Sequence, residues 1–269
     1  MELKINLFRA IRNGNLEEVK KLLEEGVEVN VELDSEEMSE YNHEVMEDGW
    51  RGVLIDCDTP LHLATKMKNF DMFRFLVDNG ANINASNANG KTVLYNSIYY
   101  EHFEIFYNLI DLGADYNAEL RCGGTLLMLA SGKYNTRFMK ELLKRGVDVE
   151  AKDYIGRTAI YFTLRANFEN FRILYDAGAD INICPKFMEP LLGEACIEQA
   201  QEVVEFLIKL GVDINQKGPH GNTPLANTSE NDSKEIAKLL IMAGAIIDSR
   251  NKDEDTPCIE QLGNRMKTL

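Results

Sequence analysis

A glycine recurs along this chain at a nearly constant interval, and each copy opens a similar five-residue stretch. GADIN begins at Gly178, and GANIN, GADYN, GVDVE and GVDIN begin at Gly80, Gly113, Gly146 and Gly211. The full glycine series is Gly26, Gly80, Gly113, Gly146, Gly178, Gly211 and Gly244. The later intervals are 33, 33, 32, 33 and 33 residues, and the first is 54, which is 33 plus an insertion of 21. Such a period indicates a solenoid of stacked units rather than one globular core.

Other positions keep the same register as the glycines. Four residues before each glycine the chain has a leucine, seven times in seven: Leu22, Leu76, Leu109, Leu142, Leu174, Leu207 and Leu240. An upstream segment has an aliphatic residue at its third position: Leu7, Leu61, Leu94, Leu127, Ile160, Leu192 and Leu225. The pattern predicts two helices in each unit, with the glycine ending the second helix in a left-handed conformation. One such pair cannot bury its own apolar face, so neighbouring pairs must stack.

The clearest copy of the first helical segment is TPLHLAT, from Thr59 to Thr65. Thr59 suits the N-cap of a helix, and Pro60 suits its first turn because that position needs no N–H donor. Together with the 33-residue step, these columns resemble the ankyrin repeat, whose signature is T-P-L-H-x-A. The resemblance implies an all-α repeat solenoid: a curved ankyrin-type stack of about seven helix-turn-helix-hairpin units, with N- and C-terminal capping units.

The resemblance covers nearly the whole chain, which we interpret as a single ankyrin repeat domain over residues 1–269. The units are predicted near 1–30, 59–91, 92–124, 125–157, 158–189, 190–222 and 223–255, with a C-terminal stub at 256–269. Later signature copies read TVLYNS, TLLMLA, TAIYFT, PLLGEA and TPLANT, so the histidine of the signature survives only as His62. Its hydrogen bond to the helix start is therefore expected to be absent or replaced in the other units.

Residues 31–58 form an acidic insertion that contains the only tryptophan, Trp50. A loop of this length inside a repeat array is unusual and often functional. Two interpretations stay open: a disordered or locally packed elaboration of a hairpin, or an acidic arm that meets a basic partner with Trp50 as its anchor.

Composition and motifs argue against several function classes. The net charge is −15, from 29 Lys and Arg against 44 Asp and Glu, and such a surface repels nucleic acid. No apolar run approaches the length of a membrane span, and the five cysteines are scattered, as in a reduced cytoplasmic protein. No catalytic or phosphate-binding motif appears. The sequence therefore predicts no enzyme activity, no cofactor and no metal site.

The resemblance also implies where a partner would bind. In ankyrin repeats the hairpin tips and the exposed side of each first helix line a concave surface. The matching positions that we single out are basic, aromatic or otherwise apolar: Lys66, Met67, Lys91, Tyr99, Tyr100, Arg121, Lys133, Tyr154, Ile155, Arg157, Arg165 and Phe187. A basic, aromatic inner face and an acidic back would suit an acidic partner segment with apolar anchors. Alternatively, Tyr99 and Tyr100 pack against adjacent helices, and the basic residues only solvate the tips.

The predicted function is that of a non-enzymatic protein–protein interaction module, monomeric and cytoplasmic, which holds another protein on its concave face. Two alternatives stay open. One is a repeat-type effector or regulator that acts in a host cell and is delivered to the host cytosol. The other is a nucleic-acid binder that uses the basic inner face.

Overall fold

The computed structural model describes residues 2–47, 58–229 and 233–252, and these divide into two compact units, Met1–Cys122 and Gly123–Leu269. The described residues form helices and loops, with one isolated antiparallel bridge between Ser86 and Thr92 and no strand. The predicted all-α repeat fold is therefore confirmed. The predicted C-terminal stub at 256–269 lies outside the described residues.

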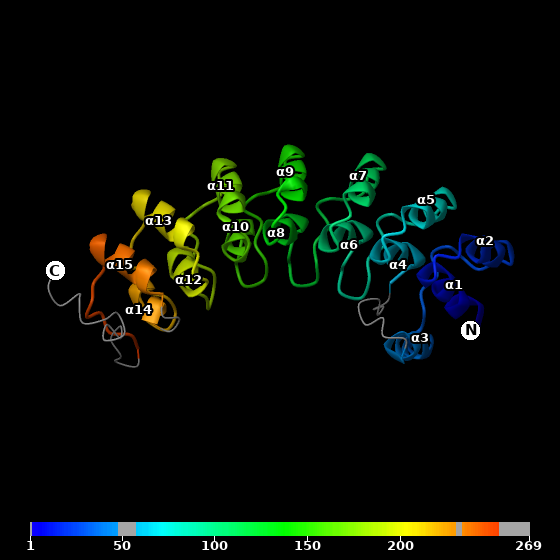
Figure 1. Ribbon diagram of the computed structural model, residues 1–269, viewed down its shortest axis with the longest axis horizontal. Helices are drawn as coiled ribbons and strands as arrows, with labels where there is room; N and C mark the ends of the chain where they lie inside the picture. Colours follow the sequence, from blue (N-terminus) through cyan, green and yellow to red (C-terminus); the bar gives the residue numbers. More distant parts are fainter. Residues whose placement is uncertain (1, 48–57, 230–232, 253–269) are drawn as a thin grey trace. The chain divides into compact units, whose positions relative to one another are not determined.

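The first unit contains three helix pairs and one further helix (Figure 1). The pairs are α1 (Glu2–Arg12) with α2 (Leu16–Glu24), α4 (Pro60–Lys66) with α5 (Phe70–Asp78), and α6 (Val93–Tyr99) with α7 (Phe103–Asp111). The further helix, α3, spans Ser35–Glu47. Within this unit the first helices of the pairs lie in one row and the second helices in another (Figure 1).

The second unit contains four helix pairs among its described residues. They are α8 (Leu126–Ser131) with α9 (Arg137–Lys144), α10 (Ala159–Phe162) with α11 (Phe168–Asp176), α12 (Leu191–Ile197) with α13 (Gln201–Lys209), and α14 (Pro224–Ser229) with α15 (Lys234–Met242). A short 3-10 helix, η2 (Thr163–Arg165), continues α10. The same two rows, of first helices and of second helices, are seen within this unit (Figure 1).

The two aliphatic columns of the sequence form the core of the stack. All seven leucines that precede the glycines are at most 2% exposed. The aliphatic column of the first helices is buried as well, from Leu7 to Leu225. Within each compact unit these side chains lie between the two helices of a pair and between neighbouring pairs, so burial between pairs stabilises the array.

The glycine that ends each second helix adopts a positive φ, as at Gly80, where φ is 86°. There the N–H of Ala81 donates to the Leu76 carbonyl at 3.0 Å, and the N–H of Gly80 donates to the Val77 carbonyl at 3.0 Å. These two hydrogen bonds together form the Schellman motif, which needs a residue in the left-handed conformation directly after the helix. A Cβ at Gly80 would meet no atom within 4 Å, so backbone conformation, and not crowding, requires the glycine.

In several repeats the residue that closes the GADIN stretch links its hairpin to the next one along the chain. Asn30 Oδ1 accepts a hydrogen bond from the Asn82 N–H at 2.7 Å, and Asn84 Oδ1 accepts one from the Asp115 N–H at 2.9 Å. In the second unit Asn215 Oδ1 accepts from the Ile246 N–H at 2.8 Å. A side-chain oxygen at this position thus satisfies a backbone donor of the next repeat, which explains why asparagine recurs there.

The acidic insertion contains a helix that the sequence analysis did not predict. Asp34 Oδ1 accepts hydrogen bonds from the N–H groups of Glu36 and Glu37, and Glu37 Oε2 accepts one from the Asp34 N–H at 2.9 Å. These reciprocal bonds form a capping box that starts α3. The first part of the insertion is therefore ordered, and Leu33, Glu37 and Tyr41 are buried. The segment 48–57, with Trp50, lies outside the described residues.

Two glycines of the second unit make room for a buried carboxylate. Asn227 Nδ2 donates to Glu189 Oε2 at 3.2 Å and to the Gly193 carbonyl at 3.4 Å. A Cβ at Gly193 would lie 3.1 Å from Glu189 Oε2, and one at Gly218 would overlap the Glu189 carboxyl group. Neither glycine has a positive φ, so they serve to accommodate Glu189.

We expect Gly218→Ala to lower the free energy of unfolding by about 1–3 kcal/mol, because the new methyl group displaces Glu189 from Asn227. The control is Gly132→Ala, where the nearest atom to a Cβ is 3.7 Å away, and we expect it to change stability little. Urea unfolding of both variants measures the difference. Equal midpoints would contradict the proposed role of Gly218.

Candidate partner-binding surface

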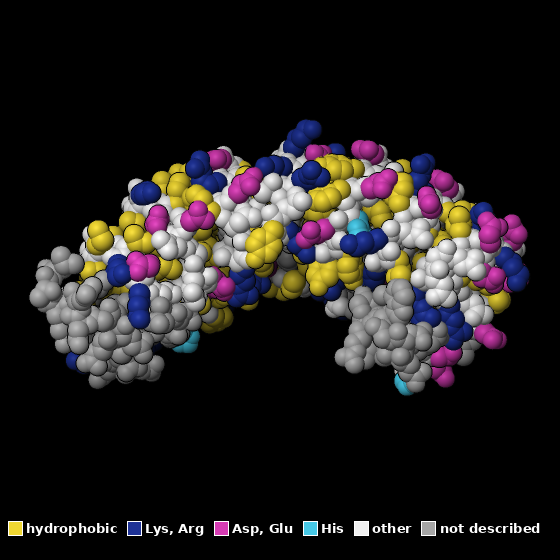
Figure 2. Space-filling view, in the orientation of Figure 1, with side chains coloured by type: hydrophobic (Ala, Val, Ile, Leu, Met, Phe, Trp, Pro, Cys, Tyr) yellow, Lys and Arg dark blue, Asp and Glu magenta, His cyan; other side chains and the backbone are white. Residues whose placement is uncertain are grey.

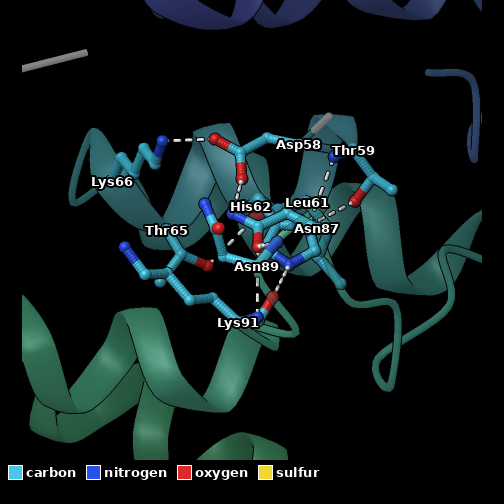
Figure 3. Close-up of polar contacts among 9 residues, drawn as sticks. All are labelled: Asp58, Thr59, Leu61, His62, Thr65, Lys66, Asn87, Asn89 and Lys91. Atoms are coloured by element: carbon cyan, nitrogen blue, oxygen red, sulfur yellow. Dashed lines mark hydrogen bonds and ion pairs between the residues drawn. The ribbon is translucent and has the colours of Figure 1, made fainter. Parts of the chain in front are cut away.

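The start of α4 is held by a buried polar network that also fixes the neighbouring hairpin tip (Figure 3). The Thr59 N–H donates to His62 Nδ1 at 3.2 Å, so this nitrogen carries no proton. His62 Nε2 therefore bears the hydrogen and donates to the Lys91 carbonyl at 3.1 Å. Burial lowers the pKa of His62 and keeps the ring neutral, although Asp58 acts in the opposite direction.

Asp58 is fully buried beside this histidine, and its carboxylate accepts from Asn87 Nδ2 at 3.0 Å and pairs with Lys66 (Figure 3). Asn87 Oδ1 in turn accepts from the N–H groups of Asn89 and Lys91. The network thus shapes the hairpin tip at 87–91. Lys66 was predicted to contact a partner, but its side chain is only 9% exposed and its charge compensates Asp58.

In two other repeats, different side chains make the hydrogen bonds that His62 makes in its own repeat. Met128 Sδ accepts from the Thr125 N–H at 3.4 Å, which repeats the cap on the helix start. Tyr161 OH donates to the Glu189 carbonyl at 3.1 Å, as His62 does to the Lys91 carbonyl in the first unit. The expected loss of the histidine bond is therefore compensated in part by residues at the same register position.

Helix α6 carries a cluster of aromatic side chains. Tyr95 stacks on Tyr99 with centroids 6.0 Å apart, and Tyr99 meets Tyr100 edge-on at 5.0 Å. Tyr100 stacks on His102 at 6.3 Å. Lys91 Nζ lies 5.5 Å from the Tyr95 ring centroid, a cation–π distance. Tyr99 is 49% exposed, so this cluster offers an aromatic surface beside a cation.

Burial raises the pKa of Tyr95 and of Tyr100, with the neighbouring Tyr99 as a further cause for both. The phenols therefore keep their hydrogens, which makes them hydrogen-bond donors as well as apolar surface. The other predicted residues of this unit differ in exposure. Met67 is half-buried, and Arg121 is exposed at the next hairpin tip, where its N–H donates to the Asn89 carbonyl at 3.2 Å.

In the second unit, two hairpin tips present large apolar side chains. Tyr154 is 77% exposed, and its ring packs over Gly123, where a Cβ would lie 2.7 Å from the ring. Ile155, next to it, is also exposed. Phe187 is 77% exposed and adopts a φ of 66°, with Lys186 Nζ 5.0 Å from its ring centroid. A bulky residue in the left-handed region is strained, and such strain is concentrated at functional sites.

Two of the three predicted basic residues of this unit, Arg157 and Arg165, are engaged in ion pairs. Arg157 Nε donates to Asp153 Oδ2 at 2.8 Å, and its guanidinium lies 4.6 Å from the Phe162 ring centroid. Arg165 donates to Glu198 Oε1 at 2.8 Å. Lys133 is half-buried, and its carbonyl accepts from an asparagine of α11. Intramolecular acids therefore neutralise much of the predicted basic face.

The opposite side of the pairs shows mixed charge rather than one sign. Figure 2 shows Lys and Arg side chains interspersed with Asp and Glu along the second helices α9 and α11, whereas α7 carries only the acids Glu104 and Asp111. The predicted contrast between a basic inner face and an acidic back is thus weaker than expected. Aromatic exposure distinguishes the candidate surface better than net charge does.

Two comparisons address the family. A model of three ankyrin repeat copies matches residues 7–120, and a single ankyrin repeat model matches residues 220–252. The chain belongs to the ankyrin repeat family. Ankyrin repeats are general protein–protein interaction modules, so this membership supports a binding role.

The ankyrin repeats resemble segments of several known proteins. The potassium channel AKT2/3 of Arabidopsis thaliana is 32% identical over 122 residues, which are 45% of this chain and 15% of the channel. Protein phosphatase 1 regulatory subunit 27 of Homo sapiens is 39% identical over 66 residues, 24% of this chain and 43% of that protein. The matches thus span less than half of these curated relatives. The solved ankyrin repeat domain of human ASB11 aligns with a TM-score of 0.68 at 22% identity, covering 77% of this chain and 93% of that domain.

Residues 2–47, 58–229 and 233–252 contain no group of three His, Cys, Asp or Glu side chains that could hold a metal ion. None of the helices in the described part of the chain is long and apolar enough to cross a membrane.

The sequence analysis did not predict two features of the insertion, the helix α3 and the burial of Tyr41. Tyr41 is fully buried, with its ring centroid 5.9 Å from that of Phe8. The Asp34-x-x-Glu37 spacing that precedes it is a capping-box signal and could have predicted α3. Trp50, the predicted anchor of the insertion, lies outside the described residues, so its role stays a prediction.

We expect His102→Asn to stabilise the ankyrin array, most strongly at mildly acidic pH. His102 is the N-cap of α7 but makes no side-chain cap bond, whereas Asn15, Asn69 and Asn167 cap their helices. The new cap is worth about 1 kcal/mol. Burial, and secondarily the charge of Lys68, lower the pKa of His102 from 6.5 to about 4.

The direction of the pH effect follows from this shift. The unfolded chain takes up a proton on His102 near pH 6.5 while the folded chain stays neutral. Above that pH His102 is neutral in both states and does not lower the free energy of unfolding. As the pH falls toward 4, protonation of His102 in the unfolded chain lowers the free energy of unfolding progressively. The Asn variant lacks this loss, so its thermal midpoint should exceed that of the wild type more at about pH 5 than at about pH 7.5. The control is His43→Asn at an exposed position of α3; a pH-independent difference for His102→Asn would contradict the assignment.

A second substitution tests the strain at Phe187. We expect Phe187→Asn to raise the free energy of unfolding by about 1 kcal/mol, because asparagine tolerates the left-handed region. Tyr154→Asn is the matched control, since Tyr154 is equally exposed but has a negative φ. Chemical denaturation compares the two. A destabilised Phe187→Asn would show that the phenylalanine ring contributes more to folding than its backbone strain costs.

Proposed function

We propose that this chain is a non-enzymatic protein-binding module that holds a segment of another protein on its first helices and hairpin tips. The observation that carries the proposal is the exposure of Tyr99, Tyr154 and Phe187 on these elements. Aromatic side chains supply large contact areas at low entropic cost and are enriched among residues that dominate binding energy. Tyr99 lies on a first helix, and Tyr154 and Phe187 lie on hairpin tips, so each occupies a repeat position at which the family resemblance implies partner contact.

The strain at Phe187 supports the same proposal. A phenylalanine at a φ of 66° costs folding free energy, and an exposed ring recovers little of it by burial. Selection for stability alone would favour glycine or asparagine there, as at the tips that carry Gly90 and Gly221. A binding role would account for keeping the ring at this tip.

The ion pairs of the surface favour a protein partner over nucleic acid. Arg157 and Arg165 already contact carboxylates, and Lys66 compensates a buried acid. Phosphate recognition needs cations whose charge is available, and the whole chain carries −15. One relative is by name a regulatory subunit of a protein phosphatase, which accords with a role as a binding subunit.

The proposal predicts that Tyr99→Ala, Tyr154→Ala and Phe187→Ala together abolish partner capture without unfolding the chain. All three side chains are substantially exposed, so the loss of packing is small. The measurement is affinity capture from a native lysate with quantitative mass spectrometry, comparing wild type and variant. Circular dichroism checks the fold.

The matched control is Tyr107→Ala, Tyr134→Ala and Met242→Ala. These exposed side chains lie on α7, on the turn before α9, and on α15, away from the first helices and tips. The control should keep the captured proteins. If both triple variants retain them equally, the proposed surface is wrong.

A further inference from the structure

Helix α3 is seated against α1 on the side opposite α2 (Figure 1). The Tyr41 ring meets Phe8 edge-on with centroids 5.9 Å apart, and the Arg12 guanidinium lies 5.6 Å from the Tyr41 centroid. Lys4 Nζ lies 3.6 Å from Glu37 Oε2, and Arg9 pairs with Glu40 at 3.5 Å. Figure 2 shows basic and acidic side chains beside each other in the region of these two helices. The chain thus binds an acidic helix on one of its own first helices.

The contacted residues of α1 form a stripe with a spacing of four: Lys4, Phe8 and Arg12. Spaced by four, they lie on one face of the helix. The equivalent positions in the next two repeats lie 54 and then a further 33 residues along the chain. They are Asp58, His62 and Lys66 in one repeat, and Lys91, Tyr95 and Tyr99 in the other. The third stripe again combines a basic residue with aromatic residues.

The three stripes differ in the groups that neutralise their charges and cover their aromatic residues. In the first, Glu37 and Tyr41 of α3 cover the basic and aromatic residues. In the second, Asp58 belongs to the stripe itself, is fully buried and pairs with Lys66. The third stripe contains no acid. Lys91 lies over the Tyr95 ring, and Tyr99 keeps 49% of its surface exposed.

The stripe Arg157, Tyr161 and Arg165 in the second unit is a useful contrast. It is basic–aromatic–basic, like the stripe of α1. Its two arginines pair with Asp153 and Glu198, and Tyr161 OH donates to a backbone carbonyl. A carboxylate of the chain thus pairs with at least one basic residue in each of these three stripes, which makes the stripe of α6 the strongest candidate for an acid from outside.

We propose that the stripe of Lys91, Tyr95 and Tyr99 docks an acidic helical segment of the partner that carries a Glu-x-x-x-aromatic pair, as α3 docks on α1. This inference rests on the proposed function and adds the chemistry of the partner. The Glu of the segment would face Lys91, as Glu37 faces Lys4. Its aromatic side chain would pack against the exposed Tyr99, at the position that corresponds to Arg12, because Tyr95 is itself only 8% exposed.

The spacing of the stripe explains why the segment is helical. Glu37 and Tyr41 are four residues apart and reach Lys4 and Phe8, which are also four apart. Two helices that lie side by side match such spacings, whereas an extended segment places residues four apart roughly 13 Å from each other. The phenols of α6 also offer hydrogen-bond donors to further carboxylates.

A peptide with the sequence of residues 32–47, ELDSEEMSEYNHEVME, tests the inference. It carries a fluorescent label and is titrated with the full chain at low and at moderate salt, with anisotropy as the readout. We expect saturable binding that weakens with salt, as for contacts between exposed charges. Lys91→Ala with Tyr99→Ala in the chain should weaken binding at least tenfold. Replacing the tyrosine of the peptide, Tyr41→Ala, should do the same.

Two controls separate the proposed mode from general attraction. Arg74→Ala with Tyr107→Ala removes a cation and a tyrosine from the second helices α5 and α7, and should leave binding unchanged. A scrambled peptide of the same composition should bind at least tenfold more weakly. The inference is overturned if no binding occurs, if the scrambled peptide binds equally, or if the Lys91 and Tyr99 substitutions have no effect.

The peptide could instead displace α3 from α1. Such binding would not depend on Tyr99, so it would appear as the outcome in which the Lys91 and Tyr99 substitutions have no effect. The result also differs from a failure of the proposed function. If the peptide fails to bind but partner capture still depends on Tyr99, Tyr154 and Phe187, the binding surface stands and only the chemistry of the partner is wrong.

Discussion

Burial of apolar side chains between successive helix pairs is the interaction on which the rest of this structure depends. A pair such as α4 and α5 packs between its neighbours, because α4 contacts both α1 and α6, and these neighbours help to remove its leucines from water. The second helices are short, and nine-residue helices such as α5 are marginal in isolation. Stacking therefore stabilises the helices as well as the array, and the Schellman glycines and the asparagine links fix how one pair follows another.

Because stacking depends on the buried sides of the helices, the outward side chains of the first helices and tips are available for binding. Their buried sides satisfy the stack, so the outward positions can vary with little cost to folding. Tyr99, Tyr154 and Phe187 occupy such positions. The buried network around Asp58 and His62 shows how a tip is shaped from beneath, since its bonds to residues 87–91 hold the backbone that carries Lys91.

Much of the fold could be predicted from the sequence because the repeat supplies many independent observations of one pattern. The leucine and glycine columns identified the helix pairs, the left-handed stops and the family. Helix α3 was missed because it occurs once, within an acidic segment, where no second copy reveals its register. Its capping box at Asp34 and Glu37 was the only local signal.

The candidate surface was predicted by position but not by energetics. Sequence register located Lys66, Arg157 and Arg165 on the first helices and tips, yet their pairing with Asp58, Asp153 and Glu198 depends on side chains that meet only after folding. The φ of Phe187 could not be foreseen either, because phenylalanine rarely adopts that conformation. Such features depend on the folded surroundings of a residue rather than on its place in the repeat.

The covalent connection of α3 to α1 has a consequence for competition. A helix joined to its binding site by a short chain experiences a local concentration in the millimolar range, whatever the dilution of the protein. A free segment of similar chemistry would have to bind α1 far more tightly than α3 does before it could take that place. If the array binds an acidic helical segment as we propose, the insertion would direct that segment to later repeats and distinguish sites that the repetition would otherwise make alike.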